Sequence, residues 1–159
     1  MKSALPTLVI GAVALAGVAS TALAQTMDEH KIVSPDKIEW GPGSAALPPG
    51  AEAALLFGDP TKEELYANRV KYPAGYSIPP HTHPIREVIT VLSGTFGLGM
   101  GETADRSKVQ PLPAGSFFVL PPGTAHYVFI DEETIIQQNT IGPSGITYIN
   151  PEDDPRKKQ

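Results

Sequence analysis

The chain has 159 residues, with 17 acidic and 12 basic side chains and no cysteine. A chain of this length folds most simply as one domain, and the missing cysteine excludes disulfides, cysteine-ligated zinc, iron–sulfur clusters and thiol nucleophiles. The formal net charge of −5 argues against nucleic-acid binding, because such a groove needs a basic stripe. Any chemistry must therefore come from histidines, carboxylates, hydroxyls or a bound metal.

The first 24 residues have the composition of a secretory signal peptide. Lys2 is the only charge before Asp28, residues 8–19 are an uncharged run, and residues 22–24 (Ala-Leu-Ala) form a small-x-small cleavage site. The run is short for a membrane span, which needs about 20 apolar residues. We expect cleavage after residue 24, no stable membrane span afterwards, and a secreted protein, in a bacterial periplasm. An uncleaved N-terminal anchor is the alternative.

The rest of the chain divides into a polar entry segment (residues 25–37), a packed domain (38–150) and a charged, peripheral tail (151–159). Glycine and proline make up about a fifth of the chain, against about 12% in average usage. Apolar segments between such turn residues predict short strands, at residues 53–57, 65–72, 87–92, 95–100, 117–120, 127–130, 135–141 and 146–149. The pattern favours an all-β sandwich or small barrel.

Three of the four histidines lie close enough in sequence to share a site. In a strand, His81 and His83 lie on the same face. A straight strand would hold Glu87 roughly 20 Å from His81, so a shared ion requires a bend, which Pro84 provides. We therefore expect His-x-His to close one strand, Glu87 to open the next, and His126 to come from a separate strand. By itself, the His-x-His pair fits two solvated histidines equally well.

Two spaced motifs make the chain similar to the cupin superfamily of small jelly-roll barrels. The first motif is met at Gly75, His81, His83, Glu87 and Gly94, with every spacing kept. The second motif is met at Gly115, Pro121, Gly123 and His126. Its closing Asn is replaced by Ile130, which puts a local hydrogen bond in doubt. The resemblance implies that residues 38–150 form one RmlC-like cupin domain, a double-stranded β-helix (jelly-roll) barrel.

The same resemblance implies a metal site with His81, His83, Glu87 and His126 as ligands. Three imidazoles and one carboxylate suit Mn, Fe, Co, Ni, Cu or Zn, and suit Ca or Mg less well. In an octahedron, four protein ligands leave two positions open for a substrate, with or without O₂. The identity of the metal does not follow from the sequence. A metal-free cupin whose histidines merely line a pocket is the alternative.

Further pocket residues are predicted from strand alternation. One of Gln137 and Gln138 should face inward and contact substrate or make a structural hydrogen bond. Arg69 either binds a substrate carboxylate or lies on a solvated face. Tyr76 and Tyr127 flank ligand positions and are expected to cover the pocket mouth.

Two functional classes follow from a metal site in a cupin barrel. The first is a metalloenzyme of dioxygenase, isomerase or lyase type that acts on a small oxygen-rich molecule. The second is a non-catalytic periplasmic protein that binds a metal or small ligand for sensing or scavenging. A structural barrel with a vestigial site is a third possibility. The resemblance also implies a possible homodimer that exchanges N-terminal strands around residues 38–57.

Overall fold

The structure, a computed structural model, describes residues 30–158. The expected signal peptide lies outside these residues. In chain order the described strands are β1 (Gly41–Pro42), β2 (Glu52–Phe57), β3 (Leu65–Tyr72), β4 (Ser77–Thr82), β5 (Glu87–Ser93), β6 (Thr95–Met100), β7 (Gln110–Pro113), β8 (Phe117–Leu120), β9 (His126–Phe129), β10 (Thr134–Ile141) and β11 (Thr147–Tyr148). Short 3-10 helices (η) are η1 (Pro35–Lys37), η2 (Arg106–Lys108), η3 (Pro151–Asp153) and η4 (Pro155–Lys157).

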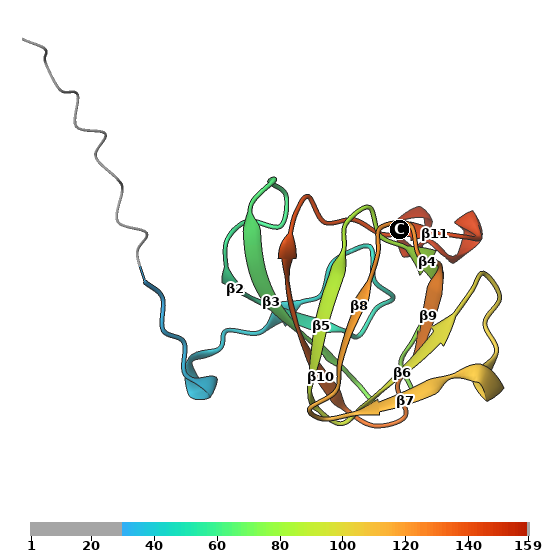
Figure 1. Ribbon diagram of the computed structural model, residues 1–159, viewed down its shortest axis with the longest axis horizontal. Coiled ribbons are helices and arrows are strands. Elements are labelled where there is room, and N and C mark those ends of the chain that lie inside the picture. The colour runs from blue at the N-terminus through green and yellow to red at the C-terminus, as the bar shows by residue number, and fades with distance from the viewer. Residues whose placement is uncertain (1–29, 159) are drawn as a thin grey trace, which may run out of the picture. The chain divides into compact units, whose positions relative to one another are not determined.

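The strands form two antiparallel sheets that face each other across a shared core (Figure 1). The first sheet, sheet A, has the order β1-β2-β3-β10-β5-β8, and the second, sheet B, has the order β11-β4-β9-β6-β7. Sheet A contributes Val70, Ile89 and Ile136 to the core, and sheet B contributes Ile78 and Val128. The predicted all-β jelly roll is confirmed. The predicted exchange of N-terminal strands with a second copy stays a prediction.

Strand alternation decides which side chains enter the space between the sheets. In β3 the buried residues are Tyr66, Val70 and Tyr72, all of one parity, and Pro73 follows the last residue of the strand. In β5 the buried residues are Glu87, Ile89 and Val91. Because successive strand residues point to opposite faces, each strand presents one apolar row with a few polar members to the interior.

The bend expected at Pro84 is present. β4 ends at Thr82 and β5 begins at Glu87, so the chain leaves sheet B and enters sheet A within four residues. The backbone N–H of Gly123 donates to the carbonyl of His83 over 2.9 Å. This bond ties the turn of the second motif to the bend of the first motif.

The position where the motif Asn is missing belongs to the core. The side chain of Ile130 is fully buried in the hydrophobic cluster. Its backbone N–H donates to the carbonyl of Tyr76, and its carbonyl accepts from the N–H of Gly75, both over 2.8 Å. The backbone of Ile130 therefore connects the start of the first motif to the end of the second.

The described part of the chain contains no helix with the length and apolar character needed to cross a membrane.

Candidate metal centre

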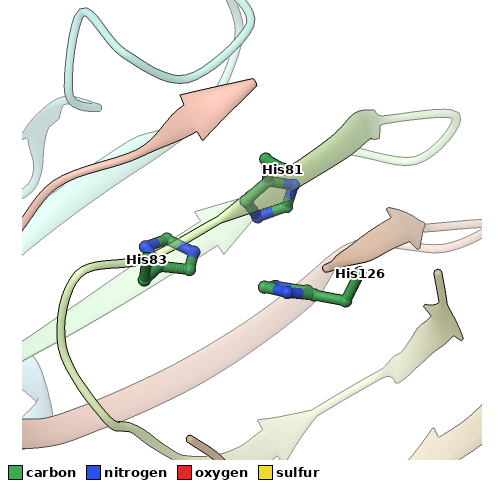
Figure 2. A group of neighbouring side chains, drawn as sticks. All are labelled: His81, His83 and His126. Carbon is green, nitrogen blue, oxygen red and sulfur yellow. The ribbon is translucent and has the colours of Figure 1, made fainter. Parts of the chain in front are cut away.

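Three histidines from two neighbouring strands converge on one point (Figure 2). His81 lies in β4 and is directly paired with His126 at the start of β9, and His83 follows the end of β4. Each of the three offers a ring nitrogen within 4.8 Å of the other two. The ring centroids of His81 and His126 are 4.2 Å apart, and those of His83 and His126 are 5.4 Å apart. The structure thus gathers these three predicted ligands.

Each imidazole is held by a hydrogen bond from Nδ1 to a backbone carbonyl. His81 Nδ1 lies 2.7 Å from the oxygen of Pro79, and His126 Nδ1 lies 3.1 Å from that of Thr124. His83 Nδ1 lies 2.7 Å from the oxygen of Gly145, in the loop between β10 and β11. Because a carbonyl only accepts, each Nδ1 must carry the proton, and each Nε2 is left as a bare lone pair. Such bonds fix the ring orientation and tautomer of metal-binding histidines.

Glu87 brings a carboxylate to the same place from the opposite sheet. Its Oε1 lies 3.3 Å from Nε2 of His83, and its Oε2 lies 3.1 Å from Nε2 of His126. The group is almost fully buried, and Oε2 has no hydrogen-bond donor. Glu87 therefore contacts His83 and His126 and lies next to the three-histidine group.

Burial sets the protonation of all four groups. It lowers the pKa of His81 to about 3, with further lowering by His126 and His83. Burial and then His126 lower the pKa of His83 to about 4, and burial also lowers the pKa of His126. It raises the pKa of Glu87 to about 7. At neutral pH the imidazoles are neutral, which is the state that binds metals.

The donor set fits a divalent transition metal. When Glu87 is ionised, three bare nitrogens and its carboxylate face one another with acceptor atoms only, and buried acceptors without a donor or cation are costly. A cation between them satisfies all four at once, including the unpartnered Oε2 of Glu87. Mixed nitrogen and oxygen donors of this kind suit Mn, Fe, Co, Ni, Cu and Zn.

The candidate ligands line a cavity of about 420 Å³ between the sheets. Part of its wall is apolar and includes Ile78, Phe96, Val128 and Ile136. Polar side chains on sheet A form another part of the wall, namely Tyr66, Asn68 and Gln138. A volume in this range is typical of sites for small molecules.

Gln137 and Arg69 do not line this cavity. They are paired across β10 and β3, and Arg69 Nε donates to Gln137 Oε1 over 2.9 Å. Their neighbours Gln138 and Asn68 line the cavity, so alternation places Gln137 and Arg69 on the opposite face of sheet A. The predicted substrate role of Gln137 and Arg69 is therefore wrong. Of the alternatives, Gln138 is the inward glutamine, and Arg69 lies on the outer face of sheet A.

Tyr76 and Tyr127 are also absent from the cavity wall. Both rings are buried, and their hydroxyls donate to the backbone carbonyls of Pro48 and Asp105, respectively. Because both hydroxyls are used in packing the barrel, the prediction that these tyrosines cover the pocket mouth is wrong.

Tyr66, Asn68 and Arg156 are among the cavity residues that sequence reasoning missed. Tyr66 and Asn68 share the parity of Val70 and Tyr72 and alternate with the charged Arg69 and Lys71, which was a signal for inward side chains. Arg156 lies in the tail that was expected to be peripheral, yet it lines the cavity. Asp154 holds its guanidinium through two oxygens at 2.8 and 2.7 Å, and the carbonyl of Ile146 accepts from it over 3.2 Å. No sequence pattern indicated this placement.

Comparison with known proteins identifies the family. A family model described as "Domain of unknown function (DUF4437)" matches residues 28–156. The chain belongs to the DUF4437 family. Germin-like protein 5-1 of Oryza sativa subsp. japonica is 39% identical to this DUF4437 chain over 61 residues, which are 38% of this chain and 28% of that protein. The chain thus matches less than a third of the length of this curated relative.

Solved structures share the fold at low sequence identity. An RmlC-like cupin from Shewanella frigidimarina NCIMB 400 has a TM-score of 0.53 and 19% identity, over 69% of this chain and 87% of that chain. The polyketide cyclase RemF from Streptomyces resistomycificus has a TM-score of 0.61 and 18% identity, over 80% of this chain and 91% of that chain. These likenesses show that the DUF4437 chain has the jelly-roll cupin fold.

Proposed function

We propose that this DUF4437 chain is a metal-dependent cupin enzyme that acts on a small oxygen-rich molecule in the barrel cavity. The observation that carries the proposal is the convergence of three bare Nε2 atoms and an unpartnered carboxylate oxygen on the wall of that cavity. His81, His83, His126 and Glu87 would hold the ion. Without a cation, these four buried acceptor groups would destabilise the fold.

When bound, the metal supplies Lewis acidity and, for redox-active ions, activation of O₂. The chain supplies the surroundings. The backbone tethers at Nδ1 hold the three imidazoles in place, and the single carboxylate of Glu87 leaves the centre with a net positive charge for a dication. This charge favours a substrate that binds through an anionic oxygen. The apolar wall excludes water from the substrate body.

The polar residues of the cavity favour an enzyme over a protein that only stores metal. Tyr66, Asn68 and Gln138 line the same cavity as the ligands. A storage site needs no such contacts for an organic molecule. Dioxygenase, isomerase and lyase reactions are all compatible with this centre. The fold alone does not select among them.

The first test is metal content. We expect about one divalent transition metal per chain by elemental analysis of protein loaded with Mn, Fe, Ni, Cu or Zn. His126→Ala should lose the metal, and His30→Ala, which changes an exposed histidine, should retain it. Protein that stays metal-free after loading with each ion would overturn the proposal.

The second test is turnover. O₂ uptake and product formation should be measured with enediols, catechols and β-diketones for each metal form. Activity that requires the metal and is lost in Glu87→Gln supports the enzyme. A chain that binds metal and small ligands but turns over no compound of the panel would favour the non-catalytic binding protein instead.

A further inference from the structure

Three polar side chains on the cavity wall have no part in holding the ion. Tyr66, Asn68 and Gln138, here called the polar band, lie on the inner face of β3 and β10. Asn68 and Gln138 are direct cross-strand partners, and Tyr66 is two residues before Asn68 on the same face. The next inward residues along these strands, Val70 and Ile136, are apolar. On β3 and β10, the polar part of the wall is thus confined to the polar band, and Ser44, Thr61, Ser144 and Arg156 add polar groups from other segments.

The hydrogen bonds of the polar band are incomplete. The hydroxyl of Tyr66 donates to Gln138 Oε1 over 3.2 Å. Asn68 Oδ1 is shielded from solvent and has no donor. Buried polar atoms are normally paired, and an unpaired one destabilises the fold. An apolar residue at position 68 would pack against the core without this cost, as Val70 does, so packing alone does not explain the amide.

The polar band lines the same cavity as the candidate metal ligands. Burial raises the pKa of Tyr66, hydrogen bonding to Ser144 partly offsets this rise, and the carboxylate of Glu87 adds a smaller rise. The hydroxyl of Tyr66 therefore stays protonated at neutral pH and remains a donor. A molecule that contacts Glu87 and the histidines would have Tyr66, Asn68 and Gln138 as the polar neighbours on sheet A.

We infer that the polar band is a specificity-determining subsite that binds a hydroxyl group of the substrate. Once the Asn68 amide turns toward the cavity, a substrate hydroxyl donates to the unpaired Oδ1 and, at the same time, accepts from an amide N–H of the band. A ligand with acceptors alone, such as a β-diketone, leaves Oδ1 unpaired. The substrate class is therefore a hydroxylated, polyoxygenated molecule with an apolar body that fits the apolar wall. This inference rests on the proposed function, because the remaining oxygens would bind at the metal centre.

Two probes that differ by one hydroxyl test the subsite. Tropolone chelates a metal through two oxygens, and 7-hydroxytropolone carries one further hydroxyl. With the zinc-loaded chain, absorbance titrations should show that 7-hydroxytropolone binds about tenfold more tightly than tropolone, as one additional buried hydrogen bond allows. In Asn68→Leu and in the smaller Asn68→Ala this preference should fall to about one, with the metal content unchanged.

The neighbouring glutamines provide a matched pair of variants. Gln138→Leu should reduce the preference, and Gln137→Leu, on the opposite face of sheet A, should leave it intact. The melting temperature separates recognition from a structural role. Asn68→Leu removes an unpaired buried oxygen, so the metal-free variant should melt at the same temperature as the parent chain or higher.

Equal binding of the two probes to the zinc-loaded parent chain would overturn the subsite and leave the metal centre standing. So would a preference that survives in Asn68→Leu, or a melting temperature lowered by several degrees in that variant. A chain that takes up no metal would instead overturn the proposed function, and the subsite with it.

Discussion

Replacing Glu87 by glutamine should stabilise the metal-free protein and destabilise the metal-loaded protein relative to the parent chain. Burial raises the pKa of Glu87 from its ordinary 4.5 to about 7. Between these pH values the folded chain binds a proton that the unfolded chain releases, so the free energy of unfolding falls as the pH rises through this window. The loss is complete above pH 7. Each tenfold change in proton affinity is worth about 1.4 kcal/mol, and the ionised carboxylate therefore costs the metal-free fold about 3 kcal/mol.

Glutamine removes this cost. It carries no charge at any of these pH values, and its NH₂ group can donate to a bare Nε2 of His83 or His126, which lie beside the carboxylate. For a domain of this size we expect the melting temperature of metal-free Glu87→Gln to exceed that of the parent chain by about 10 °C at pH 8. At pH 5 the difference should nearly vanish, because Glu87 is then protonated.

Thermal unfolding followed by circular dichroism, with a chelator and then with excess zinc, measures both halves of the prediction. At a free zinc concentration of about 1,000 times the Kd, the parent chain gains about 4.1 kcal/mol. The variant should gain much less, because it lacks the anionic ligand, and the order of stability should reverse. Glu102→Gln, an exposed change, should leave both curves unaltered.

Burial lowers the pKa of His81, His83 and His126, so these groups destabilise the metal-free fold at acid pH in both proteins. The difference between variant and parent chain cancels this contribution. A metal-free variant that is less stable than the parent chain at pH 8, or a difference that does not change with pH, would refute the reasoning.

Three further predictions concern packing and processing. Gly99→Ala places a Cβ against the buried ring of Tyr127 and should lower the free energy of unfolding by about 3 kcal/mol in denaturant titrations; Gly41→Ala, which meets open space, should have little effect, and equal effects would contradict this packing. Ile130→Asn, which restores the motif residue, buries an amide in the core and should cost about 4 kcal/mol, against about 1 kcal/mol for Ile130→Val; a stability equal to that of the parent chain would show that the motif Asn is tolerated there. Mass spectrometry of chain expressed in a bacterial host should find a mature form that starts at Gln25 in the periplasm, and an intact, membrane-retained chain would point to the uncleaved anchor.

The resemblance to the two cupin motifs located the candidate ligands, and strand geometry is compatible with that ligand set. His81 and His83 share a face only in an extended strand, and Pro84 permits the bend that brings Glu87 back to them. The bounds of β3 were also predictable, since its alternating residues lie between a turn and Pro73. By contrast, β7 was missed, because Pro111 and Pro113 disfavour a strand; it lies at the edge of sheet B, where a missing N–H is tolerated.

The inner face of β10 could not be read from its sequence. The segment Ile135-Ile136-Gln137-Gln138 carries one isoleucine and one glutamine of each parity, so alternation alone left the inward glutamine undetermined. Pairing with β3 and β5 resolved it, because Gln138 lies between Asn68 and Ile89 in the sheet. Long-range register of this kind is a property of the folded chain. The same holds for Arg156, whose place at the cavity depends on where the last turns of the chain pack.

The bond between His83 and Gly145 has a consequence for how this family diversifies. The carbonyls that hold His81 and His126 are two residues away from their partners, whereas the carbonyl that holds His83 is 62 residues away along the chain. A small change in the loop before β11 therefore alters the basicity and orientation of one ligand without altering any ligand residue. Insertions and substitutions in this loop give evolution, and protein engineering, a separate means of changing metal preference while the four ligand positions stay the same.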